Sequence, residues 1–230
     1  NNVVYVQKFP WSFDNNLAWW DIIKWPTISM DDYQAVMTRS TKVEAASFLA
    51  ARGDRIKYES NVANDAVVAA VTENLEKVVS FEIEKGRYFS PFEYASGSNV
   101  AVLGADIAER LFENADPLGK TVTIAGHKAR IIGVLKKEGE GGISLSNTDE
   151  ITLIPLKFGR SFINLKNRFV DSQMMIKAKP DVSVQELSDD VTMILRAARR
   201  LKPVETTNFS VNTATMLSQG FDAVFAGINI

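Results

Sequence analysis

One stretch near the end of the chain constrains the fold most: an amphipathic helix between two short strand-like runs. Ser183 and Glu186 match the S-x-x-E capping box, in which the two side chains bond backbone groups at a helix start. Pro203 is expected to end the helix because proline cannot continue it. Strands are expected over 172–179 and 206–212, which makes this a β-α-β unit. The apolar residues of the helix recur every three or four positions, as one stripe: Val184, Leu187, Val191, Ile194, Ala198 and Leu201.

The beginning of the chain predicts a second β-α-β unit. Residues 2–7 contain a β-branched and aromatic run that is typical of a buried strand. Ser29 is expected to cap a helix over 30–39, with Asp31 and Asp32 in its first turn, where negative charge is favourable. Further strands are expected over 42–51, over 54–60 as its hairpin partner, and over 66–72.

The middle of the chain is rich in expected strands. Ala125 and Gly126 are expected to form the turn of a hairpin, since glycine readily adopts a positive φ. Residues 136–146 are expected to form a glycine-rich loop. Together with the two β-α-β units, this pattern predicts an α+β protein in which one domain is discontinuous and the other is inserted into it. The elements expected here are strands at 99–103, 120–124, 127–135 and 151–154 and helices at 104–112 and 157–163.

Composition excludes several classes of function. The chain has no cysteine and one histidine, so it cannot supply a zinc finger, an iron–sulfur cluster or a multi-histidine metal site by itself. Lys and Arg number 26 against 28 Asp and Glu, which leaves no basic surplus for nucleic acid. The chain starts at Asn1, not at methionine, and residues 221–230 are rather apolar. We therefore expect it to be a piece of a longer protein.

Motifs for catalysis are near misses. Residues 114–121 end like a Walker A loop, but Asn114 replaces its first glycine and a strand is expected where the phosphate-binding helix belongs. Residues 142–146 lack the last glycine of a nucleophile elbow. A serine triad would have to use His127, which follows a hairpin glycine and is expected to be an exposed turn residue. The sequence therefore assigns no catalytic, cofactor-binding or metal-binding residue.

Pairs of acidic residues leave a hydrolase open as one alternative. Two carboxylates that act on a glycosidic bond can be far apart in sequence, so spacing cannot exclude them. Most of the pairs have simpler explanations, such as a helix start or a polar helix face. The pairs are Asp31 with Asp32, Glu82 with Glu84, Glu138 with Glu140, and Asp189 with Asp190.

A cluster of tryptophans is the most unusual local feature. All four lie within fifteen residues: Trp11, Trp19, Trp20 and Trp25. Core packing is one interpretation. The other is a partner-binding or membrane-interface surface, where tryptophan is favoured. On the second interpretation the chain is a stand-alone extracytoplasmic module that binds a peptide or glycan. The cations near the end of the last helix, Arg196, Arg199 and Arg200, are expected to complement the helix dipole.

An ordered series of motifs carries a family resemblance. The chain reads GRYFS at 86–90, NVAVLG at 99–104, AERLF at 108–112, DPLGKTV at 116–122 and IIGVL at 131–135. This series resembles the extracytoplasmic core domain of MacB-type ABC transporter permeases, a group that includes the FtsX and lipoprotein-release permeases. The run TLIP at 152–155 extends the likeness.

The resemblance implies a fold and a role. The fold would be a porter-like domain of two β-α-β units, residues 1–80 and 166–230, with an inserted mixed α/β domain, often called Sabre, at 81–165. The role would be non-catalytic, with ATP hydrolysis in a separate domain or subunit. No cofactor or metal is implied.

The resemblance also implies a setting. The domain would lie outside the inner membrane, between two transmembrane helices that precede Asn1 and follow Ile230. These helices would transmit the movement driven by ATP to a periplasmic substrate or partner. The implied partners are a second permease copy, a cytoplasmic ATP-binding subunit or domain, and in the MacB branch a periplasmic adaptor.

Overall fold

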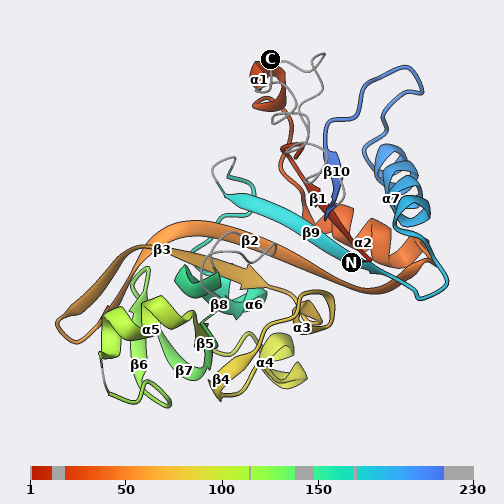
Figure 1. The fold of residues 1–230 in the computed structure, drawn as a ribbon. Helices are drawn as coiled ribbons and strands as arrows, with labels where there is room; N and C mark the ends of the chain where they lie inside the picture. Colours follow the sequence, from red (N-terminus) through yellow and green to blue (C-terminus); the bar gives the residue numbers. More distant parts are fainter. Residues whose placement is uncertain (1, 12–18, 114, 138–147, 168–169, 215–230) are drawn as a thin grey trace, which may run out of the picture. The chain divides into compact units, whose positions relative to one another are not determined.

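The computed structural model describes the chain except for residues 1, 12–18, 114, 138–147, 168–169 and 215–230 (Figure 1). It divides into two compact units, the first made of Asn1–Phe48 with Ser172–Ile230 and the second of Leu49–Asp171. The units change at 48/49 and 171/172, whereas the sequence placed its domain boundaries at 80/81 and 165/166. Most of the expected glycine-rich loop lies outside the described residues.

Among the described residues, the first unit contains four strands in the order β10-β1-β9-β2. β1 (Val3–Gln7) is antiparallel to both of its neighbours, β9 (Asp171–Ala178) and β10 (Ser210–Thr213). The fourth strand is the first part of β2 (Val43–Tyr58). Residues 3–6 are all buried, which fits a β-branched run in a central strand.

Two helices of the first unit carry the expected caps. In α2 (Met30–Arg39) the Ser29 side chain accepts from the Asp32 backbone N–H, and the Asp32 side chain bonds back to the backbone of Ser29. α7 (Val184–Ala198) has the same reciprocal cap between Ser183 and Glu186. The two helices pack on each other, and α7 contacts β1 and β10 (Figure 1). A one-turn helix, α1 (Trp19–Ile22), precedes them.

The buried face of α7 differs from the stripe expected from sequence. The residues that are buried are Leu187, Ser188, Val191 and Leu195, whereas Ile194 is half-exposed. From Leu187 onward the buried apolar side chains recur every four residues, at Val191 and Leu195. This spacing forms one ridge along the helix, which packs on α2 and the sheet. The helix also ends at Ala198, short of Leu201, because Arg200 has a φ of 54° that no right-handed helix can contain.

The second unit is built on a mixed sheet. Its strands beyond the rest of β2 are β3 (Asn61–Val71), β4 (Ile83–Gly86), β5 (Val100–Leu103), β6 (Thr121–Ile124), β7 (His127–Leu135) and β8 (Ile151–Pro155). The pairings run β2-β3-β8-β5-β7, and β6 then joins β7 back to β2, so six strands close a ring. β3–β8 and β5–β7 are parallel pairs, and the others are antiparallel. β4 extends the sheet beside β7.

Short helices cover the sheet of the second unit. α5 (Ala105–Phe112) and α6 (Leu156–Gly159) both contact β3, and α4 (Pro91–Ser96) contacts α6. The hairpin expected at Ala125 and Gly126 is confirmed, with φ angles of 49° and 83°. No described helix is long and apolar enough to cross a membrane. The helical elements are α3 (Leu75–Val78), α4 (Pro91–Ser96), α5 (Ala105–Phe112), the 3-10 turn η1 (Thr148–Glu150) and α6 (Leu156–Gly159).

One expected hairpin is wrong. The runs 42–51 and 54–60, expected to be partners, are parts of the single strand β2, which pairs instead with β3. Arg52, Gly53 and Asp54 interrupt the apolar pattern but continue the strand, with a change of register after Asp54. Such a bulge keeps a strand in its sheet while breaking the period-two pattern, so local sequence mimics a turn.

Candidate functional site

The expected tryptophan surface centres on α1. Trp19 and Trp20 are 62% and 57% exposed, and their rings meet edge to face with centroids 6.1 Å apart. Large exposed aromatic side chains lose the free energy of burial, and tryptophan is enriched at binding interfaces. This pair is therefore the most conspicuous exposed apolar feature of the first unit among the residues described.

Two further exposed apolar side chains lie close to the contact between Lys8 and the end of α1. Phe9 is 51% exposed and Ile23 is 43% exposed. The ammonium of Lys8 donates to the carbonyl oxygen of Ile23 at 2.6 Å and lies 5.9 Å from the centroid of the Phe9 ring, which holds the segment after β1 against the end of α1. We call Phe9, Trp19, Trp20 and Ile23 the α1 patch.

The other two tryptophans are placed differently. The ring of Trp11 packs on Tyr5 of β1 with centroids 4.8 Å apart, and its backbone N–H donates to the Asn212 side chain. It is half-buried, as is Trp25, whose backbone N–H donates to Ile22. The structure thus brings Trp19 and Trp20 together in one exposed pair, while Trp11 braces β1 and β10.

The cations at the end of α7 are part of the fold. Arg199 pairs with Asp32 at 2.7 Å, with side chains only 9% and 7% exposed. Arg199 also donates to the carbonyl oxygen of Asn208 and lies over the Phe209 ring. Arg196 donates to the Lys202 carbonyl oxygen. These contacts tie the end of α7 to α2 and to the segments that follow the helix, and none of them is made to a carbonyl oxygen of its last turn.

Two buried carboxylates are held in the ionised form. Burial alone would raise the pKa of Asp32, but the hydrogen bonds and charge of Arg199, with those of Ser29, lower it overall. The paired hydrogen bonds from Arg87 lower the pKa of Glu93 to about 2, although burial opposes the shift. A general acid needs the opposite shift, so neither group suits the hydrolase alternative.

The other residues considered for catalysis or metal binding have structural surroundings. The His127 Nδ1 lies 3.1 Å from the Ala125 carbonyl oxygen, and its ring stacks on Phe162 with centroids 4.9 Å apart. Lys120 precedes β6, so no helix follows the Walker-like run. Within the described ranges, no three His, Asp or Glu side chains gather as a metal site would require. Residues 142–146, Glu138 and Glu140 lie outside those ranges.

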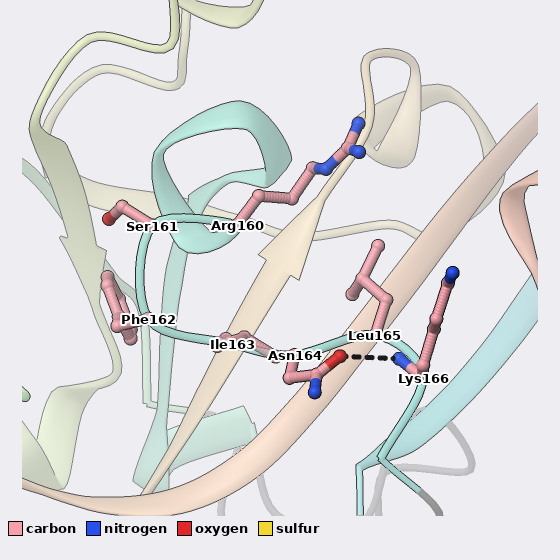
Figure 2. A pocket seen from close by; sticks show the side chains of 7 residues that line it. All are labelled: Arg160, Ser161, Phe162, Ile163, Asn164, Leu165 and Lys166. Carbon is pink, nitrogen blue, oxygen red and sulfur yellow. Dashed lines mark hydrogen bonds between the residues drawn. The ribbon is translucent and has the colours of Figure 1, made fainter.

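A shallow pocket of about 390 Å³ lies in the second unit, at the loop after α6 (Figure 2). Residues 160–166 line it, and Arg160 and Lys166 are its charged members. Sequence reasoning missed this pocket because it expected 157–163 to be helical. Helical spacing would have spread these side chains around an axis, whereas the chain turns after Gly159 and gathers them.

Comparison with known proteins shows which family has a similar sequence. The family model of the MacB-like periplasmic core domain matches residues 1–194. The uncharacterized ABC transporter permease YknZ of Bacillus subtilis is 30% identical over 129 residues, covering 55% of this chain and 32% of that protein. The macrolide export ATP-binding/permease protein MacB of Neisseria meningitidis serogroup A is 23% identical over 197 residues, covering 84% and 28%.

A solved structure shares the fold. The periplasmic region of MacB from Actinobacillus actinomycetemcomitans superposes with a TM-score of 0.75 at 14% identity, over 96% of this chain and 92% of that one. The chain spans about a third or less of the length of the curated relatives named above. The family match covers most of the chain and includes all the motifs from 86 to 155. The chain therefore belongs to the family of MacB-like periplasmic core domains.

Proposed function

We propose that the chain is the non-catalytic, extracytoplasmic domain of an inner-membrane ABC transporter permease. It couples ATP hydrolysis elsewhere in the transporter to the export or movement of a periplasmic substrate or partner. Its implied partners are a second permease copy, a cytoplasmic ATP-binding domain or subunit, and a periplasmic adaptor. The first compact unit would be the porter-like part and the second the Sabre-like part.

One structural observation carries this proposal beyond the family match. β1 and β10 are antiparallel neighbours, with Val4 opposite Thr213 and Gln7 opposite Ser210. The start of β1 and the end of β10 therefore lie side by side. A domain inserted between two membrane helices needs this arrangement, because its entry and exit must meet the same membrane surface. A movement of either helix would reach the same sheet directly.

Labelling in the full-length protein tests the location. We expect a cysteine placed at Glu59, the exposed turn between β2 and β3, to react with a membrane-impermeant maleimide in intact cells with a permeabilised outer layer. This chain itself has no competing cysteine. A cysteine in the ATP-binding part serves as control and should react only after lysis. Labelling of both sites only after lysis would contradict the proposal.

The α1 patch favours a second candidate function, a surface that binds a peptide or glycan partner through Trp19 and Trp20. The outer two tryptophans, Trp11 and Trp25, would support it from half-buried positions. We expect acrylamide to quench wild-type fluorescence strongly, and the Trp19→Phe/Trp20→Phe variant to retain only weakly quenched emission. Equal quenching constants in both proteins would show that the pair is shielded and would remove this candidate.

A further inference from the structure

The loop 160–166 is held in one shape by contacts that do not involve its charged groups. The Ile163 side chain is buried, and the backbone N–H of Ile163 donates to the Gly159 carbonyl oxygen at 2.7 Å. Arg52 of β2 donates to the Phe162 carbonyl oxygen at 3.1 Å. The Asn164 side chain accepts from the Lys166 N–H at 3.0 Å. The pocket is therefore preformed, which lowers the entropy cost of binding.

The lining combines positive charge with an apolar contact. The side chains of Arg160, Leu165 and Lys166 project to the same side of the loop (Figure 2). Both cations are exposed, and Leu165 is half-exposed. None of the residues that line the pocket is acidic. No ion pair is formed by Arg160 or Lys166 within the part of the chain that the structure describes. The volume is that of a small-molecule site.

We propose that this pocket binds a small amphiphilic anion. Its carboxylate pairs with Arg160 and Lys166, since guanidinium and ammonium groups both suit this partner. Its apolar part covers Leu165, which otherwise stays partly in water. The Phe162 carbonyl oxygen, which could repel an anion, accepts a hydrogen bond from Arg52. The proposal does not depend on the transport function.

Amide chemical shifts of the ¹⁵N-labelled 230-residue chain test it, with octanoate as the probe. We expect saturable shifts at residues 160–166, with a dissociation constant on the order of a millimolar for so small a ligand. Acetate has the charge without the chain, and octan-1-ol has the chain without the charge. Each is expected to bind more weakly than octanoate, because each meets only half of the site.

Two matched variants distinguish the effect of the positive charges at the pocket from the effect of the protein's net charge. The Arg160→Gln/Lys166→Gln variant should bind octanoate about tenfold more weakly, as expected for two exposed ion pairs. The Arg55→Gln/Lys57→Gln variant removes the same charge from an exposed stretch of β2 and should bind like the wild type. All four side chains are exposed, so both variants should keep the wild-type spectrum. Equal affinity in the two variants, or shifts confined to the α1 patch, would overturn the proposal.

Discussion

At the scale of single residues, the pair of Asp32 and Arg199 ties three parts of the first unit together. Asp32 caps α2, while Arg199 ends α7 and holds the segment at Asn208 that leads into β10. Both side chains are more than nine-tenths buried. Removing one partner of a buried pair leaves the other charged without compensation, which costs more than the pair itself contributes.

We expect Asp32→Asn to lower the free energy of unfolding by about 3 kcal/mol, in the range measured for broken buried pairs. Asp31→Asn is the control, since Asp31 is exposed on the same helical turn and its loss removes only a fraction of a kcal/mol of dipole interaction, about 0.5 kcal/mol. Urea unfolding at neutral pH measures both. If the two variants lost similar amounts of free energy of unfolding, the Arg199 charge would have found compensation in Asp32→Asn and the explanation would be wrong.

The same pair sets a dependence on pH. The folded pKa of Asp32 lies below its ordinary value of 3.8, so the folded state binds this proton less readily than the unfolded state. The stabilisation is therefore complete above about pH 4 and is lost as the pH falls through the lowered pKa. The stability gap between wild type and Asp32→Asn should shrink below pH 4. A gap that stays constant down to pH 2 would contradict this.

At the scale of elements, β7 is shaped by a close backbone approach. A side-chain carbon on Gly133 would collide with the backbone carbonyl oxygen of Arg87, which follows β4. A backbone atom cannot yield as the end of a flexible side chain can. The conformation of Gly133 is not itself unusual, so the need for glycine comes from space alone.

We expect Gly133→Ala to lower the free energy of unfolding by about 3 kcal/mol, the upper part of the range for overpacking. Gly53→Ala is the matched control, because a side-chain carbon at Gly53 in β2 meets nothing within 4 Å. That substitution should be neutral or slightly stabilising, by about 0.5 kcal/mol. Chemical unfolding of the two variants gives the comparison, and a neutral Gly133→Ala would show that β7 can move away from Arg87.

Elements with strong local signals could be predicted from sequence, and those fixed by distant partners could not. The caps at Ser29 and Ser183 and the turn at Ala125 depend on neighbours in the chain, and all three are confirmed. The cap of α4 by Ser90 and Glu93 has the same S-x-x-E spacing, with proline at the first helical position, and was still missed because the helix is so short.

The candidate sites show the same division. The tryptophan cluster was visible in sequence, but its split into an exposed pair and a brace on Tyr5 depends on β1 and on Asn212, two hundred residues away. The loop pocket gave no signal at all, since its shape comes from Arg52 and from a turn where a helix was expected. Helical propensity is a weak prior that such tertiary contacts override.

At the scale of the whole molecule, the second compact unit is one continuous stretch with its own closed ring of strands. A continuous unit with its own core can fold alone. We expect an excised fragment of residues 49–171 to unfold in one cooperative transition. A fragment limited to 81–165, the inserted domain expected from sequence, lacks β2 and β3. In it β6 loses its pairing with β2 and β8 its pairing with β3, so the ring of strands is open. This fragment should not fold. The reverse result, measured by circular dichroism, would support the boundaries expected from sequence.

The long sequence separation between β1 and its partner strands, β9 and β10, also has a consequence for synthesis on the ribosome. Val3 to Val6 are synthesised well before their partners Met174 to Lys177 and Ser210 to Thr213. At about 5–20 residues per second, an apolar strand waits roughly 10–40 s for a neighbour. During that delay the second unit has time to complete its own sheet. Chaperones that hold unpaired apolar segments should therefore contact residues 3–6 until residues 174–177 have been synthesised.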